Sequence, residues 1–189
     1  ALVPGLADDV TVPAGPANQP VVSTTANLNN LTIAPGASVT LAGSFTFNVA
    51  GNLTASGDLV VSTGTPTIQL SGTAKTLAGN VASATITGTV ALAGNTTVGG
   101  NVGISGGTAQ LSVGNSALQV GGGFSTGSGG RLVMTTAGGQ LDIAGSAAFG
   151  GGNETGLLTA GSITVGGDFS QTGSGSPTSF APSGTHLTG

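Results

Sequence analysis

Short runs of alternating apolar and polar residues follow one another along most of the chain. Clear examples are residues 38–41 (SVTL), 45–49 (FTFNV) and 58–61 (DLVV). Alternation with a period of two is typical of β-strands. Gly, Asn, Asp and Ser separate the runs, and these residues tolerate turns. No window has the periodicity and capping residues of a helix. The pattern therefore predicts an all-β chain of short strands.

A motif of the form apolar-x-apolar-small-Gly-polar-apolar recurs along the sequence. Its clearest copies span residues 96–102, 118–124, 141–147 and 163–169. The central glycines form a series with steps of 21, 22, 21, 22, 23 and 22 residues: Gly36, Gly57, Gly79, Gly100, Gly122, Gly145 and Gly167. A looser second series is offset by about one third of that period: Gly51, Gly72, Gly94, Gly114, Gly138 and Gly161. We therefore look for a repeat architecture.

Short strands within a repeat of about 22 residues predict a parallel β-helix, or β-solenoid. We expect it to be right-handed, with three faces and about seven coils stacked about 4.8 Å apart. One inward row would contain Val98, Val120, Ile143 and Val165, and another would contain Phe124 and Phe169. An antiparallel β-sandwich also uses short strands, but it does not explain six nearly equal steps.

The repeat divides the chain into three segments. Residues 1–27 carry four prolines and the Asp8-Asp9 pair, which predicts an N-terminal cap or lead-in coil. Residues 28–176 form the predicted solenoid. Residues 177–189 are a tail that ends like the opening of another strand, so we expect the truncated start of a further repeat.

The composition excludes several classes of protein. The chain has 37 glycines among 189 residues, 4% charged residues and a net charge of −4. Its two cations, Lys75 and Arg131, are too few to neutralise nucleic-acid phosphates, so no nucleic-acid partner is expected. Without cysteine there is no disulfide or thiolate metal site. No apolar run is long enough for a transmembrane helix.

Few residues offer chemistry. Asp8 and Asp9 could bind Ca²⁺, although adjacent acids in such a segment are more often solvated. Asp58 and Asp168 occupy equivalent repeat positions, but five coils would separate them, too far for a catalytic carboxylate pair. The lone His186 predicts neither a metal site nor a catalytic triad. We expect no catalytic, cofactor-binding or metal-binding residues, and we expect Lys75 and Arg131 to lie on the surface.

Asparagines recur near the marker glycines. Asn80 and Asn101 fall at equivalent positions of one series, and Asn52, Asn95 and Asn115 fall in the other. We expect them to form corner ladders, in left-handed or turn conformations, that bond along the axis. Thr-x-Thr pairs at 65–67 and 85–87 raise the alternative of an ice-binding face, but they do not recur at the repeat period.

Four segments carry a family resemblance: residues 8–13 (DDVTVP), 18–22 (NQPVV), 30–41 (NLTIAPGASVTL) and 179–186 (SFAPSGTH). They resemble the repeat regions of large secreted bacterial surface proteins, the β-helices of autotransporter passengers and filamentous haemagglutinins. The resemblance is mainly compositional and spans nearly the whole chain. It implies an extracellular or cell-surface location and a scaffold or adhesive role, and it transfers no catalytic residue.

The sequence thus predicts a structural, non-enzymatic segment of an extracellular bacterial protein. It would serve as a stalk, an adhesin body or a filament subunit. Its partners would be neighbouring domains of a longer chain, or other copies joined end to end through unpaired coils. An ice-binding face and a polysaccharide-active β-helix enzyme are the alternatives.

Overall fold

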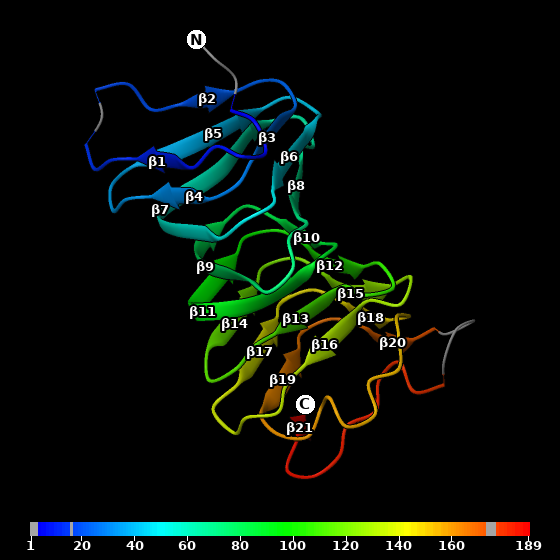
Figure 1. Cartoon of the computed structure of the whole chain (residues 1–189). Coiled ribbons are helices and arrows are strands. Elements are labelled where there is room, and N and C mark those ends of the chain that lie inside the picture. The colour runs from blue at the N-terminus through cyan, green and yellow to red at the C-terminus, as the bar shows by residue number, and fades with distance from the viewer. Residues whose placement is uncertain (1–3, 16, 173–176) are drawn as a thin grey trace.

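The computed structural model describes residues 4–15, 17–172 and 177–189. They form a parallel β-solenoid of about eight turns with about 21 residues per turn, which confirms the predicted all-β solenoid. Figure 1 shows the turns stacked along one axis from the N-terminal end to the C-terminal end. Stacking at about 4.8 Å per turn gives a length of about 38 Å. None of the described residues lies in a helix, so none of them forms a helix that could cross a membrane.

Each turn has three faces, numbered in the order in which the chain first reaches them. Face 3 is an eight-stranded sheet of β3 (Ala26–Leu28), β6 (Thr46–Val49), β8 (Thr67–Leu70), β10 (Ala84–Ile86), β12 (Val102–Ser105), β15 (Phe124–Gly127), β18 (Ala147–Phe149) and β20 (Phe169–Gln171). Every pairing between these strands is parallel.

Faces 1 and 2 join into one thirteen-stranded sheet because three long strands bend around the corner between them. These strands are β7 (Leu53–Thr63), β9 (Lys75–Val81) and β11 (Thr89–Val98). Face 1 also contains β1 (Val10–Val12), β4 (Leu31–Ile33), β13 (Gln110–Ser112) and β16 (Arg131–Val133). Face 2 also contains β2 (Val21–Val22), β5 (Ser38–Ala42), β14 (Ala117–Val120), β17 (Gln140–Ile143), β19 (Ser162–Val165) and β21 (Leu187–Thr188).

The predicted inward row of face 2 is confirmed. Val98, Val120, Ile143 and Val165 are successive register partners, and the row extends back through Val81 to Leu59. The row of Phe124, Ala147 and Phe169 on face 3 is confirmed as well. Rows from all three faces merge into one apolar core that runs through the stack.

The predicted register is wrong in the middle of the chain. Val81 pairs with Val98, only 17 positions later, so this turn is about five residues shorter than the repeat. As a result Leu77 stacks on Leu92 and not on Val98. The marker Gly79 lies over Ala55 at the corner between faces 1 and 2, whereas Gly100 bonds to Ala82 at the corner between faces 2 and 3. The seven markers nevertheless fall one to a turn, from the second turn to the eighth, so the predicted count of about seven leaves out only the first turn.

Both end segments lie within the stack. β1 and β2 pair with β4 and β5, so the described residues between 10 and 28 form the first turn, with Pro13 and Pro20 between its strands. At the other end, Pro182 bridges to Leu158 on face 1, and β21 pairs with β19 on face 2. Gly15 lies 21 residues before Gly36 and, like it, has positive φ, so the glycine series continues into the first turn, which the prediction had set apart because of its prolines.

Candidate functional site

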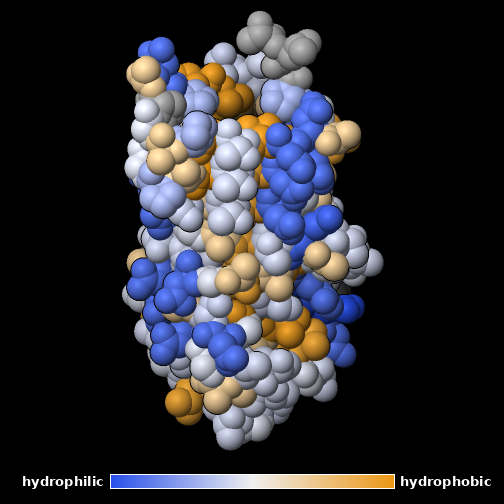
Figure 2. Space-filling model, turned by 60° about the vertical axis from the view of Figure 1, so that its left-hand side comes forward, coloured by the Kyte–Doolittle hydropathy of each residue, from blue (hydrophilic) through white to orange (hydrophobic). Residues whose placement is uncertain are grey.

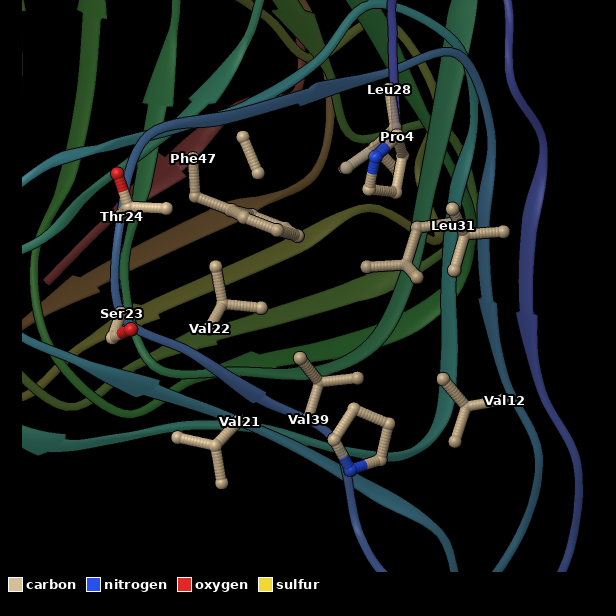
Figure 3. A pocket seen from close by; sticks show the side chains of 13 residues that line it. Pro4, Val12, Val21, Val22, Ser23, Thr24, Leu28, Leu31, Val39 and Phe47 are labelled. Atoms are coloured by element: carbon tan, nitrogen blue, oxygen red, sulfur yellow. The ribbon is translucent and has the colours of Figure 1, made fainter. Parts of the chain in front are cut away.

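The most distinctive cavity lies at the N-terminal end, where the core opens into a hollow of about 380 Å³. Figure 3 shows apolar side chains from several turns around it, among them Val12, Leu31, Val39 and Phe47. The hollow exists because the inward rows end here. Among the described strands, β1 pairs only with β4, β2 only with β5 and β3 only with β6. Each of these three strands therefore has one unpaired edge.

The C-terminal end also exposes apolar side chains. Phe169, in the last strand of face 3, is 43% exposed, and Leu187 in β21 is 69% exposed. Phe169 was expected in the core, but no described strand covers it. It packs instead in a cluster with Phe149 and Phe180, at centroid distances of 5.6 and 4.8 Å.

A ladder of side-chain oxygens runs along the corner between faces 3 and 1. Asp9 Oδ1 accepts hydrogen bonds from the backbone N–H of Asn30 (3.2 Å) and from its Nδ2 (2.8 Å). Asn30 Oδ1 accepts the N–H of Asn52 at 2.7 Å, and Asn52 Oδ1 accepts the N–H of Thr76 at 3.0 Å. Each oxygen thus serves the turn that follows it.

These bonds assign Asp9 a structural role. The Asn30 side chain, the Asn30 N–H and the Asn29 side chain stabilise its charged form and hold the pKa of Asp9 below its usual value. Asp8 Oδ2 accepts the N–H of Gly5 at 2.8 Å. Within residues 4–15, 17–172 and 177–189, no group of three His, Asp or Glu side chains is placed to hold a metal ion.

Other asparagines confirm the expected bonding along the axis. Asn95 Oδ1 accepts the N–H of Ala117 at 3.0 Å, and Asn101 Oδ1 accepts that of Gly123 at 2.7 Å. Of the two conformations expected for the asparagines, left-handed or turn, the left-handed one does not occur, because Ala74 and Ser128 are the only non-glycine residues with positive φ in the described parts of the chain. Asn80 does not stack on Asn101, because it lies within face 2.

The outer surface of face 2 carries a polar row. It consists of Asp58, Asn80, Thr97, Gln119, Asp142 and Thr164. Asp58 therefore shares a row with Asp142 and not, as expected, with Asp168, whose N–H bonds to Ser146 Oγ at a corner. Four turns separate Asp58 from Asp142, about 19 Å along the axis. The separation exceeds that of the carboxylates in glycoside hydrolases.

Glu154 is the residue whose role the sequence did not suggest. It is fully buried, at 0% exposure, in a segment where face 1 has no strand after β16. Two backbone N–H groups point to the place where the next strand of face 1 would lie. Glu154 Oε1 accepts the N–H of Leu132 at 2.8 Å, and the carbonyl oxygen of Leu157 accepts the N–H of Met134 at 2.7 Å. The carboxyl group thus replaces a strand carbonyl.

The environment of Glu154 disfavours its charge. Oε2 has no hydrogen-bond partner in the described structure, and burial raises the pKa of Glu154 to about 8 despite the opposing bond from Leu132. The N–H of Glu154 donates to the carbonyl of Thr178 at 2.9 Å, which links β16 to the last turn. No signal in the sequence distinguishes Glu154 from the other scattered acids.

The remaining charged candidates lie apart. Arg131 is not simply a surface residue, since its Nε is buried without a hydrogen-bond partner in the described structure. Lys75 is the first residue of β9, and it is half-buried. His186 lies in the last turn with Nδ1 3.1 Å from the carbonyl oxygen of Ala160.

A threonine row on face 1 was missed in the sequence. Thr11, Thr32 and Thr54 are successive register partners, and all three are exposed. Their triplets, VTV, LTI and LTA, are spaced 21 and 22 residues apart, and this would have revealed the row had residues 1–27 been included in the repeat. The pairs at 65–67 and 85–87 form no such row: Thr85 lies between Gln69 and Gly103.

Figure 2 shows how these rows shape the surface. Polar side chains line up in columns along the axis, and apolar side chains reach the surface at the upper end, beside the atoms drawn in grey. Comparison with known proteins finds no matching family model, no matching curated protein and no matching solved structure.

Proposed function

We propose that this chain is a structural segment of an extracellular bacterial surface or fibre protein. It acts as a stiff rod that separates other parts of the protein, as a stalk or adhesin body does. The observation that carries the proposal is the continuity of the stack: about eight parallel turns share one apolar core.

The physics of the stack supports this role. Strands of successive turns bond along the rod axis, and the corner side chains add bonds in the same direction. Bending the rod would require stretching these bonds on one side and compressing close-packed rows on the other. The compositional resemblance to secreted bacterial β-helices supports the location. The distance between Asp58 and Asp142 speaks against the alternative of a polysaccharide-active enzyme.

Surface labelling of the producing bacterium tests the proposal. An antibody raised against the solenoid should label intact cells, and external protease should remove that labelling while an intracellular control protein survives. Labelling that requires permeabilised cells would contradict an extracellular role.

The threonine row on face 1 keeps ice binding as a second candidate, because exposed threonines about 4.8 Å apart form a regular array. The row ends after Thr54, whose next partner is Ala78. Thermal hysteresis that disappears in Thr32→Tyr would favour this candidate over the structural role.

A further inference from the structure

We propose that Asn153 is an acceptor for an N-linked sugar, which it would carry on a surface loop of the folded chain. Asparagine followed two positions later by serine or threonine, with no proline between them, is the sequence that N-glycosylating transferases recognise. The chain has four such triplets, at residues 30–32, 52–54, 95–97 and 153–155. The proposal rests on the extracellular location proposed above, because N-linked sugars are typical of exported proteins.

The triplet at 153–155 lies in an irregular segment between β18 and β19. Glu154 anchors this segment, because its side chain is fully buried and accepts the N–H of Leu132. Its two neighbours in the chain, Asn153 and Thr155, are both exposed. The loop therefore presents to solvent both the carboxamide that would carry the sugar and the hydroxyl group that a transferase recognises.

A hydrogen bond within the loop orients the Asn153 carboxamide. Its Oδ1 accepts the N–H of Thr155 at 2.8 Å, which closes a turn. Within the described residues, neither Asn153 Nδ2 nor Thr155 Oγ1 has a hydrogen-bond partner. A Cβ atom added at the next residue, Gly156, would meet nothing within 4 Å, so the outer side of the loop is open. A transferase can therefore reach Nδ2 without opening a strand pair.

The asparagines of the other three triplets are held in the stack. Asn30 Nδ2 donates to Asp9 Oδ1 at 2.8 Å. The carbonyl oxygen of Asn52 accepts the N–H of Leu31 at 2.9 Å. Asn95 lies within β11, and its Oδ1 accepts a backbone N–H of the following turn. A transferase that holds the chain on both sides of these residues must first open paired strands, so the folded structure favours the loop.

The transfer forms one bond and breaks one. Asn153 Nδ2 attacks the anomeric carbon of a sugar that is activated as a nucleoside diphosphate ester. The new C–N bond replaces the C–O bond to the diphosphate, which leaves with the electron pair of that bond, and a base of the transferase takes one proton from Nδ2. Oδ1 does not react, so its hydrogen bond with the N–H of Thr155 is retained in the product.

Transfer to the purified, folded protein tests this assignment. The probe is UDP-glucose with a soluble transferase that recognises Asn-Xaa-Ser/Thr, and peptide mapping by mass spectrometry locates the sugar. Asn153 should be modified at least about tenfold faster than Asn52 or Asn95, because their strands must open first. In a peptide digest of the protein this preference should disappear. Equal rates at the three asparagines of the folded protein would overturn the proposal.

Two variants of Thr155 and one natural asparagine serve as controls. Thr155→Ala removes the hydroxyl group and should abolish transfer to Asn153, whereas Thr155→Ser should keep it. Both variants should melt like wild type, because the side chain is exposed. Asn101 is exposed as well, but Gly103 stands two positions after it, so it should stay unmodified. Transfer to Thr155→Ala at the wild-type rate would contradict recognition of the triplet.

Peptide mapping of the protein from the producing bacterium completes the test. A sugar on Asn153 is the expected result. An unmodified Asn153 in protein that is labelled on intact cells would overturn the proposal and leave the structural role unaffected. Failure of the surface labelling would contradict the extracellular location alone, because transfer to the purified protein does not depend on it.

Discussion

Glu154 should make the stability of the protein fall as pH rises. The folded protein holds the carboxyl group protonated up to a pKa of about 8, whereas the unfolded chain ionises it near 4.5. Between these values the folded state binds the extra proton, so the free energy of unfolding decreases with increasing pH. The contribution is fully present below pH 4.5, is lost progressively up to pH 8 and is constant above that.

The magnitude follows from the two pKa values. A difference of one pKa unit corresponds to about 1.4 kcal/mol, so the loss across the whole window is at most about 5 kcal/mol. Glu154→Gln keeps an oxygen for the N–H of Leu132 and cannot ionise. We therefore expect this variant to match wild type near pH 4 and to be more stable above pH 8.

Urea denaturation of both proteins from pH 4 to pH 9 measures the difference. The two curves should diverge by about 1.4 kcal/mol per pH unit within the window. Asp142→Asn removes one charge from an exposed side chain and controls for the change in net charge. A difference between wild type and Glu154→Gln that does not vary with pH would refute the reasoning.

Three further predictions concern the stack. Ile143 is 2% exposed between Val120 and Val165, so Ile143→Asp should lower the melting temperature strongly, at a cost of several kcal/mol. Thr97→Asp, at an exposed position between the uncharged Asn80 and Gln119, is the control and should cost little; equal melting of the two variants would place Ile143 outside the core. A methyl group at Gly145 would lie 2.7 Å from the carbonyl oxygen of Gly122, so Gly145→Ala should destabilise by about 1–3 kcal/mol. Gly107→Ala, which meets nothing within 4 Å, is its control, and a loss of the same size there would contradict crowding as the cause. Asn101→Ala should lower the free energy of unfolding, measured in urea, by about 1 kcal/mol, because it removes the hydrogen bond from the N–H of Gly123. Asn101→Asp keeps an acceptor oxygen and should lower it less; an equal loss in both variants would show that this hydrogen bond is not the cause.

The part of the fold that could be predicted from the sequence is the part that repeats. The row from Val98 to Val165 was found because the turns there differ in length by only one residue. The register failed between Val81 and Val98 because corners can lose residues without disturbing the strands beside them. The spacing of the glycines does not show at which of the three corners of a turn each glycine lies.

The reason for the marker glycines was also only partly predictable. Glycine is common in turns because it tolerates positive φ, but none of Gly100, Gly122, Gly145 and Gly167 has it. Their corners bring backbones of adjacent turns so close that a Cβ atom would collide, as at Gly167, where it would lie 2.8 Å from the carbonyl carbon of Gly145. The role of Glu154 could not be predicted, because it depends on a strand that face 1 lacks after β16, and sequence periodicity reports only the strands that are present.

The corner bonds have a consequence for how the protein assembles. Asp9, Asn30 and Asn52 each offer an oxygen to an N–H of the following turn, and Asn101 does the same on another corner. A finished turn is thus a template that acts in one direction. Water hydrates both the oxygens and the N–H groups in the unfolded chain, so each of these bonds forms only when two successive turns meet. At these corners, a turn that is already in place offers an acceptor that fixes the position of the turn that follows it.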